Sequence, residues 1–432
     1  MRLNLKGNIM KFAHLADTHL GYRQFGLIER EKDFYEVFGK VIDKIIEEKV
    51  DFVIHSGDLF ETAKPSPMAL LEFQKGLLKL KGAGIPMYAI AGNHDFVMRK
   101  GSIPPQVIFK KMGLKVISPI NTNYLHDDIF IAGLPFYPAS QSNVLKSKLV
   151  ELSKKAANYE KSILVLHQGI DQYIPFQYEL EKGDIPDNFN YYAFGHIHKY
   201  IVEDFGKGKL VYPGSGEIWK TDELIDYKEN GKGFVIVDMD EPKPQIKRVK
   251  IDIPREFIVR SLDYNNLESG IAGIKETIKD FDKKPILNLE IKNVDSDTGI
   301  VYDLIKEELG DLSLMIRPTF KMVGEESITE IFDEDKRIGP KELIVEKLEG
   351  YGNSNVDKLA IDLYEYLSKD RIEDAKNIID QFYEDNYKSE DKEVDFKTEK
   401  IESEVIEEFI KEEEDLEDKP NDVQVTFKGA LE

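Results

Sequence analysis

Short apolar runs alternate with amphipathic stretches through the first half of the chain. The amphipathic stretches at 28–48 and 67–81 carry apolar side chains at helical spacing, which predicts two helices. The apolar runs, each of three to six residues, predict strands at 11–16, 52–55, 87–90, 129–134, 162–166, 191–194, 210–212 and 233–237. Strands that alternate with helices are typical of a layered α/β fold. We therefore expect a two-sheet β-sandwich flanked by helices.

Residues 251–320 have a different pattern. Strand-like runs at 255–264, 286–294 and 313–320 enclose two helical stretches, at 271–281 and 302–309. The order β-α-β-α-β predicts a small separate α/β capping domain. Because residues that bind metals are sparse in this part of the chain, a role in binding or as a lid is expected there.

The last quarter of the chain predicts helices and an acidic tail. Helical patterns cover 341–349, 356–367 and 372–383, and their apolar stripes favour docking on a partner over a private three-helix bundle. Residues 388–432 are rich in charge and are expected to be disordered. The predicted divisions are therefore a main domain at 1–250, a cap at 251–320, a helical partner-binding segment at 321–387 and a tail at 388–432.

The net charge of −22 is unusual for a protein that binds nucleic acid. Residues 321–432 hold 16 Lys and Arg against 35 Asp and Glu, so most of the negative charge lies in this C-terminal quarter and not in the residues before it. Cysteine is absent, which excludes disulfides, thiolate nucleophiles and cysteine-bound metals. The sequence shows neither a membrane span nor a signal peptide, so we expect a soluble cytoplasmic protein.

Potential metal ligands come directly after five of the predicted strands. In a parallel sheet the carboxyl ends of the strands meet at one edge, so residues distant in sequence converge there. Imidazole, carboxylate and amide oxygen together suit Mn²⁺, Fe²⁺ or Zn²⁺. The residues concerned are Asp17, His19, Asp58, Asn93, His94, Asp95, His167, His196 and His198.

Each short motif has an ordinary explanation when taken alone. Asp-x-His occurs by chance, and Gly-Asp after a strand is often only a turn. The joint pattern decides, because most of the histidines fall directly after a strand and in a consistent order. His55 is expected inside a buried strand instead, and His126 in a polar loop beside two aspartates. The sequence therefore predicts a two-metal site in which Asp58 bridges the metals and no side-chain nucleophile is needed.

The ordered motifs DTH, GD, GNHD, HQG and GHIH resemble those of the calcineurin-like metallophosphoesterase superfamily. The fuller forms LADTHLG, SGDLF, AGNHD, LHQG and GHIHK, followed by VYPGS, are similar to one branch, the archaeal double-strand-break repair nucleases of the meiotic-recombination-eleven type, related to bacterial SbcD. Many members of that branch have histidine directly after GDLF, where this chain has Glu61.

The resemblance implies a role for each residue. Asp17, His19, Asp58 and His198 would hold one metal ion, and Asp58, Asn93, His167 and His196 would hold the other. His94 would be the catalytic imidazole that protonates the leaving oxygen, oriented by Asp95. The implied cofactor is Mn²⁺, two ions per subunit.

The resemblance also implies an activity and partners. It implies a 3′→5′ exonuclease on double-stranded DNA and a single-strand endonuclease that processes ends in double-strand break repair. It further implies a homodimer, with Leu70, Ile108 and Met112 as a candidate apolar patch, and an SMC-like ABC ATPase of the Rad-fifty or SbcC type bound by the C-terminal helices. The alternatives are a phosphodiesterase of the same superfamily that acts on nucleotides or other small phosphoesters, and a non-enzymatic adaptor whose acidic tail binds basic partners.

Overall fold

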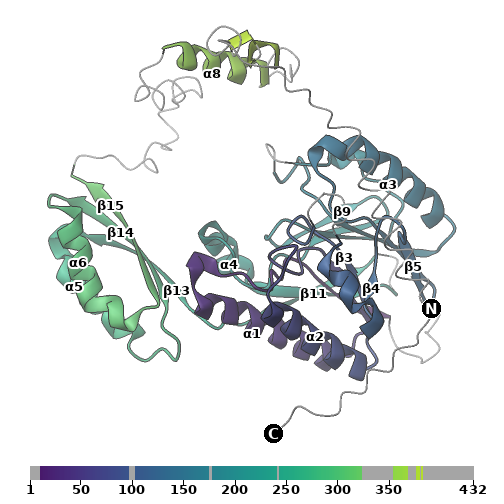
Figure 1. Ribbon diagram of the computed structural model, residues 1–432, viewed down its shortest axis with the longest axis horizontal. Helices are drawn as coiled ribbons and strands as arrows, with labels where there is room; N and C mark the ends of the chain where they lie inside the picture. The colour runs from purple at the N-terminus through teal and green to yellow at the C-terminus, as the bar shows by residue number, and fades with distance from the viewer. Residues whose placement is uncertain are drawn as a thin grey trace. The chain divides into compact units, whose positions relative to one another are not determined.

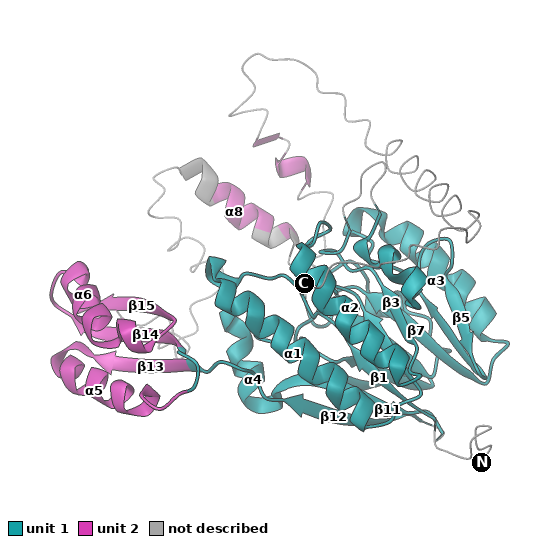
Figure 2. Cartoon of the chain, turned by 60° about the horizontal axis from the view of Figure 1, so that its bottom comes forward, with its two compact units in different colours: residues 1–257, 282–285, 398–432 teal, residues 258–281, 286–397 magenta. Residues whose placement is uncertain are grey.

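The computed structural model describes residues 10–96, 103–174, 178–240, 243–323, 354–367, 376–379 and 381–382. These residues form two compact units. Unit 1 includes the chain up to Phe257 together with Asp282–Pro285, and unit 2 includes Ile258–Phe281 and the chain that follows Pro285, as far as it is described (Figure 2). Each unit has its own apolar core.

Two six-stranded sheets form the centre of unit 1 (Figure 1). The first sheet has the order β12 (Gln245–Ile251), β11 (Lys232–Asp238), β1 (Lys11–Leu15), β2 (Phe52–Ser56), β3 (Met87–Ile90) and β4 (Lys115–Val116). The second has the order β5 (Asn123–His126), β6 (Ile129–Gly133), β7 (Lys161–His167), β8 (Tyr191–Gly195), β10 (Gly208–Tyr212) and β9 (Ile201–Phe205). Strands β1 to β4 pair in parallel, as do β6, β7, β8 and β10, and this brings their carboxyl ends to common edges.

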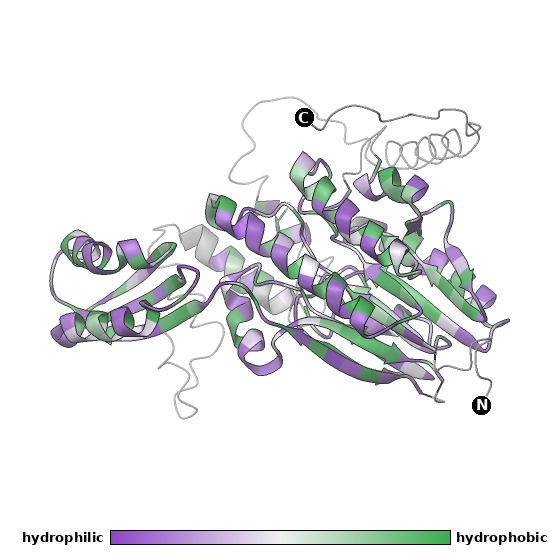
Figure 3. Cartoon of the chain, turned by 90° about the horizontal axis from the view of Figure 1, so that it is seen from below, coloured by the Kyte–Doolittle hydropathy of each residue, from purple (hydrophilic) through white to green (hydrophobic). Residues whose placement is uncertain are grey.

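The two sheets face each other across a buried apolar layer, in which Phe12 and Ile54 of the first sheet share one core cluster with Ile163 and Val165 of the second. Helices α1 (Ile28–Glu47) and α2 (Pro67–Gly82) bury their apolar faces on the outside of the first sheet. Helix α3 (Ser142–Ala156) does the same on the second sheet. Figure 3 shows the expected pattern, with mostly apolar strands and helices that have one apolar and one polar side. The predicted two-sheet sandwich flanked by helices is confirmed.

Unit 2 contains a three-stranded sheet with two helices. Strands β13 (Phe257–Asp263), β14 (Ile286–Val294) and β15 (Met315–Met322) lie in that order, and β14 pairs with β15 in parallel. Helices α5 (Leu267–Ile278) and α6 (Thr298–Leu309) cover the sheet with a buried apolar stripe, of which Ile271 and Ile305 are members. The element order β-α-β-α-β is the one predicted.

The tail is described only in part. Helix α8 (Ser354–Leu367) coincides with the helix predicted at 356–367. The helix predicted at 341–349, half of that at 372–383 and the acidic tail at 388–432 lie outside the described residues. Within the part of the chain that the structure describes, no helix is both long enough and apolar enough to cross a membrane.

The prediction for His126 was wrong. This residue ends strand β5 and is half-buried, and its Nδ1 lies 3.0 Å from the Tyr88 hydroxyl. Strand β5 is an edge strand of the second sheet, and none of its four residues is fully buried. Its polar composition therefore made it look like a loop.

Candidate metal centre

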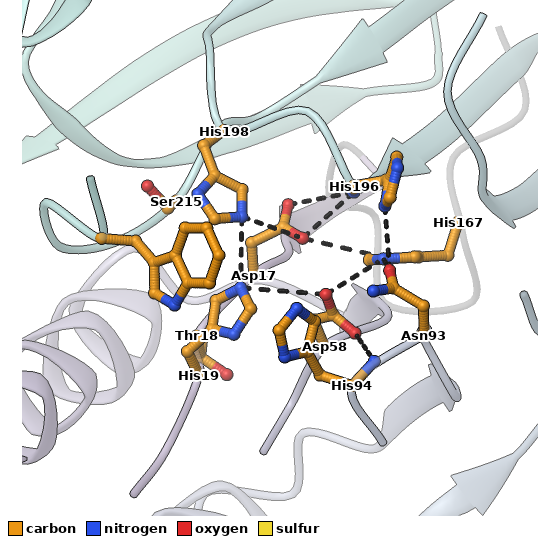
Figure 4. A network of polar contacts seen from close by, with 12 residues as sticks. Asp17, Thr18, His19, Asp58, Asn93, His94, His167, His196, His198 and Ser215 are labelled. Carbon is orange, nitrogen blue, oxygen red and sulfur yellow. Dashed lines mark hydrogen bonds and ion pairs between the residues drawn. The ribbon is translucent and has the colours of Figure 1, made fainter. Parts of the chain in front are cut away.

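The predicted ligands meet where the parallel strands of both sheets end (Figure 4). Asp17 and His19 follow β1, Asp58 follows β2, and Asn93 and His94 follow β3 in the first sheet. His167 ends β7, and His196 and His198 follow β8 in the second sheet. The face-to-face packing of the sheets thus brings together ligands from five separate segments.

The backbone at this edge adopts conformations that most residues avoid. Asp17, His19, Asp58 and His196 all have positive φ, with values of 52°, 44°, 53° and 89°. Such conformations cost about 1–3 kcal/mol each and persist where the surrounding structure requires them, commonly at functional sites. Gly57, at φ +94°, is required for a second reason, because a Cβ there would lie 2.3 Å from His167 Nδ1.

The first cluster consists of Asp17, His19, Asp58 and His198. The Nε2 atoms of His19 and His198 lie 3.1 Å apart, and His19 Nε2 is 3.8 Å from Asp58 Oδ2. His198 Nε2 is 3.9 Å from Asp17 Oδ1. Asp17, His19 and His198 present ligand atoms close enough together to hold a metal ion.

The second cluster consists of Asp58, Asn93, His167 and His196. Asn93 Oδ1 lies 3.1 Å from His167 Nε2 and 2.9 Å from His196 Nδ1. Asp58 Oδ2 lies 3.2 Å from His167 Nε2, so its carboxylate faces both clusters. This is the position that a bridging ligand must occupy.

The donor set of the first cluster fits a cation. His19 Nδ1 lies 2.8 Å from Glu61 Oε2, and His198 Nδ1 lies 2.7 Å from Glu223 Oε1. A carboxylate can only accept, so both Nδ1 atoms donate and, in the neutral imidazoles, both Nε2 atoms carry lone pairs. Two lone pairs that face each other at 3.1 Å repel unless a cation or a proton lies near them. Imidazole and carboxylate ligands suit a transition-metal ion at this point.

The electrostatics of the metal-free clusters agree with this. Burial lowers the pKa of His167, but the Asp58 and Asp17 carboxylates outweigh it and raise the pKa to about 9. Burial also opposes ionisation of Asp58, yet His167 and His19 hold the pKa of this carboxyl below its ordinary value. The pKa of His196 is lowered to about 3, first by burial and then by His167. In the metal-free protein, the extra proton on His167 thus supplies part of the positive charge that metal ions would supply.

His94 lies beside the clusters and is half-buried. Its Nδ1 lies 3.0 Å from the backbone oxygen of Glu61, which can only accept, so Nδ1 donates and Nε2 is the atom left for proton transfer.

The prediction that Asp95 orients His94 is not what the hydrogen bonds show. Asp95 is fully buried and accepts the backbone N–H groups of Leu59, Phe60 and Gly92 at 2.8–3.0 Å. It therefore fastens the turn after β2, which carries Asp58, to the turn after β3. The carbonyl of Glu61 orients His94 in its place.

Several residues at this site escaped the sequence analysis. Trp219 stacks on His19 with ring centroids 5.3 Å apart, and its indole N–H donates to Glu61 Oε2 at 3.1 Å. Glu223 contacts His198 and also forms an ion pair with the buried Lys232. As the only tryptophan of the chain, Trp219 was the one signal that could have been noticed.

Two histidines that are not ligands support the site from behind. His55 is fully buried in β2, as predicted, and its Nε2 lies 3.0 Å from the Thr18 hydroxyl. His14, which the sequence analysis passed over, lies within hydrogen-bonding distance of Tyr191 and Ser56 in the core between the sheets. The backbone oxygen of Ser56 in turn accepts a hydrogen bond from His167 Nδ1 at 2.8 Å.

Comparisons with known proteins agree with this geometry. The profile of the calcineurin-like phosphoesterase family matches residues 10–200. The chain is 36% identical over 386 residues to the DNA double-strand break repair protein Mre11 of Methanocaldococcus jannaschii, covering 88% of this chain and 100% of that protein. It is 35% identical to the protein of the same name from Methanococcus maripaludis, covering 75% of this chain and 90% of that protein. A dimetal phosphatase from Danio rerio aligns over 56% of this chain and 97% of its own with 11% identity and a TM-score of 0.38, a similarity too low to support a conclusion.

Proposed function

Because the chain belongs to the Mre11 family of DNA double-strand break repair proteins, we propose that it is a manganese-dependent nuclease that processes DNA ends. The proposed activities are 3′→5′ exonuclease action on double-stranded DNA and endonuclease action on single strands. The observation that carries the proposal is the pair of ligand clusters that share Asp58.

In the proposed site, Asp17, His19, Asp58 and His198 hold one ion, and Asp58, Asn93, His167 and His196 hold the other. When bound, the two ions would supply charge to the phosphodiester oxygens and an activated water as nucleophile. The ligand set of imidazole, carboxylate and amide oxygen favours Mn²⁺ over Mg²⁺ or Ca²⁺, which prefer oxygen alone.

The chain's own acid is His94 in this proposal. Its Nδ1–H is held by the Glu61 carbonyl, so in the imidazolium form the second proton, on Nε2, can be delivered to the leaving oxygen. His94→Gln should abolish cleavage of end-labelled duplex DNA while DNA binding persists. His126→Gln is the matched control, because His126 ends β5 and contacts Tyr88 instead of the ligand clusters. Equal loss of cleavage in both variants, or an unchanged rate in His94→Gln, would contradict the role of His94.

The choice of substrate has a direct test. With Mn²⁺ present, the protein should degrade end-labelled duplex DNA and release mononucleotides from the 3′ end. A fast reaction with bis-nitrophenyl phosphate and none with DNA would favour the alternative, a phosphodiesterase of small phosphoesters.

A homodimer is the proposed assembly, and exposed apolar side chains on two neighbouring elements support it. Leu71 on α2 and Ile108 on the 3₁₀ helix Pro105–Met112 are 42% and 62% exposed, whereas Leu70 and Met112 are partly buried against the core. The double variant Leu71→Asp, Ile108→Asp should convert the dimer to a monomer in light scattering. Val150→Asp on α3 is the matched control, because Val150 is equally apolar and 52% exposed. A monomeric wild type at micromolar concentration would remove the proposal.

The proposed partner is an SMC-like ABC ATPase that binds the C-terminal helices. Helix α8 supports this, because Leu359, Leu363 and Tyr366 recur at helical spacing along it. Deletion of residues 325–432 should spare cleavage of short oligonucleotides and abolish co-purification of the ATPase. Co-purification with the truncated chain would contradict the assignment.

A further inference from the structure

The two ligand clusters differ in what lies behind their imidazoles. In the first cluster, each imidazole donates its Nδ1–H to a carboxylate. Glu61 accepts from His19 at 2.8 Å, and Glu223 accepts from His198 at 2.7 Å. A carboxylate behind an imidazole makes the other nitrogen a stronger ligand and fixes the direction of its lone pair.

The second cluster has no comparable support among the described residues. His167 Nδ1 donates to the neutral backbone oxygen of Ser56. His196 presents Nδ1 to Asn93, and its Nε2 lies 3.9 Å from Glu179 Oε1, which is beyond hydrogen-bonding distance. Glu179 instead accepts the backbone N–H of Gly169 at 2.7 Å.

Negative charge is also divided unequally. Asp58 is common to both clusters, and Asp17 Oδ1 lies 3.9 Å from His198 Nε2 and 4.0 Å from His167 Nδ1. The second cluster contains the neutral amide of Asn93, whereas the imidazoles of the first have the carboxylates of Glu61 and Glu223 behind them. The charge of Glu223 is partly offset by Lys232, which forms a buried ion pair with it. The hydrogen bonds to the Glu61 carboxylate come from His19 and from the indole of Trp219, so its charge acts on His19 without a cation between them.

We propose that Glu61 is a positioning residue that makes the first cluster the tighter metal site, so that the first ion binds between His19 and His198 before the second cluster is filled. The proposal rests on the two-metal site of the proposed function.

The indole of Trp219 allows the order of binding to be observed. It is the only tryptophan of the chain. It stacks on His19, and it forms a T-shaped contact with His198 in which the ring centroids are 5.2 Å apart. Since Mn²⁺ quenches nearby fluorophores, an ion in the first cluster should quench its fluorescence most strongly.

The test is a titration of the metal-free full chain with Mn²⁺. Binding is measured by calorimetry and, in parallel, by the fluorescence of Trp219. The wild type should show two binding events of unequal affinity, with most of the quenching in the tighter one. Glu61→Gln keeps the size of the side chain and removes its charge. It should weaken the tighter event by about 10–100-fold and leave the weaker event within a few-fold, because loss of such a partner costs that much metal affinity.

A second neutral variant and a matched control sharpen the experiment. Glu61→His should weaken the tighter event to a similar degree, which covers the case in which Glu61→Gln fails to fold. Glu179→Gln makes the same chemical change near the second cluster and should leave the tighter event unchanged. The Mn²⁺ concentration that gives half of the maximal activity should rise in Glu61→Gln.

The outcomes separate this proposal from the proposed function. Equal affinities in the wild type, a tighter event unaffected by Glu61→Gln, or quenching that follows the weaker event would each overturn the role of Glu61. Ordered binding of two ions without cleavage of DNA would support the role of Glu61 and overturn the proposed nuclease.

Discussion

Unit 1 contains two groups of buried charged side chains that differ in how their charges are satisfied. Around α1, Arg30 donates to Asp33 at 2.8 Å and to Glu217 at 3.1 Å, and Arg255 donates to Asp33 at 2.7 Å. Every one of these contacts joins opposite charges. At the edge of the sheets, by contrast, Nε2 of His19 and Nε2 of His198 face each other at 3.1 Å, and in the neutral imidazoles both carry lone pairs.

The difference explains what each group is for. A charged group loses its hydration when it is buried, and this costs free energy unless an opposite charge pairs with it. The Arg30 group is paired within the protein, so it holds α1, the segment around Glu217 and the chain near Arg255 together. The ligand clusters are left incomplete by the protein, so they bind cations. The first group should therefore contribute to stability and the second to activity.

The largest effect should come from removing the shared carboxylate. Asp58→Asn keeps the shape of the side chain but removes the only carboxylate among the residues of the second cluster and one of the two in the first. We expect hydrolysis of duplex DNA to fall by at least about 10³-fold, because the metal ions and the charge they stabilise in the transition state depend on Asp58. Circular dichroism should show an intact fold. Activity within tenfold of wild type would contradict the assignment of Asp58 as the bridge.

Removal of a charge from the group around Arg30 should lower stability and leave activity unchanged. Asp33→Asn leaves two buried guanidinium groups without a shared counter-charge, which should cost about 3–5 kcal/mol of unfolding free energy. Urea unfolding followed by circular dichroism measures this. The affinity for Mn²⁺ and the kcat at 25 °C should match wild type in the folded protein. A variant that is equally stable but binds Mn²⁺ poorly would erase the distinction between the two groups.

A smaller effect is expected in the pH dependence of the metal affinity. The Asp58 and Asp17 carboxylates overcome burial and raise the pKa of His167 to about 9, so this imidazole carries a proton at neutral pH in the metal-free protein. Metal binding must displace that proton, so affinity should rise with pH, by about tenfold per unit between pH 6 and 9, and level off above. Calorimetry in buffers of different ionisation enthalpy would count the protons released. An affinity that is constant over this range would contradict the role of His167 as a ligand.

The smallest effect should come from an ion pair that belongs to neither group. Lys44 lies 2.9 Å from Glu47 on the exposed side of α1. Lys44→Ala should leave the melting temperature and the metal affinity unchanged, because pairs at the surface are hydrated and screened. A clear loss of stability would show that α1 depends on its exposed face more than its buried one.

The sequence predicted which residues come together at the site better than it predicted what surrounds them. Asp17, Asp58 and His167 follow strands whose apolar runs are unmistakable, and the parallel arrangement of those strands brings the residues together. The strand and helix order of residues 251–320 was predicted for the same reason, since local periodicity decides it.

The residues behind the ligands could not be predicted. Glu223 and Trp219 come from the segment after β10, and nothing in their local sequence indicates that they face histidines from β8 and β1. Asp95 was expected to orient its neighbour His94, but it is turned toward the backbone N–H groups of another loop. Such contacts depend on tertiary packing, which cannot be predicted from the spacing of residues along the chain.

Anomalous diffraction at the manganese edge, from crystals grown with saturating Mn²⁺, tests the two-metal site most directly. The account predicts two peaks about 3.5–4 Å apart, one on each side of the Asp58 carboxylate. One peak would lie near His19 and His198, and the other near His167 and His196. A single peak at saturation, or peaks away from Asp58, would contradict it.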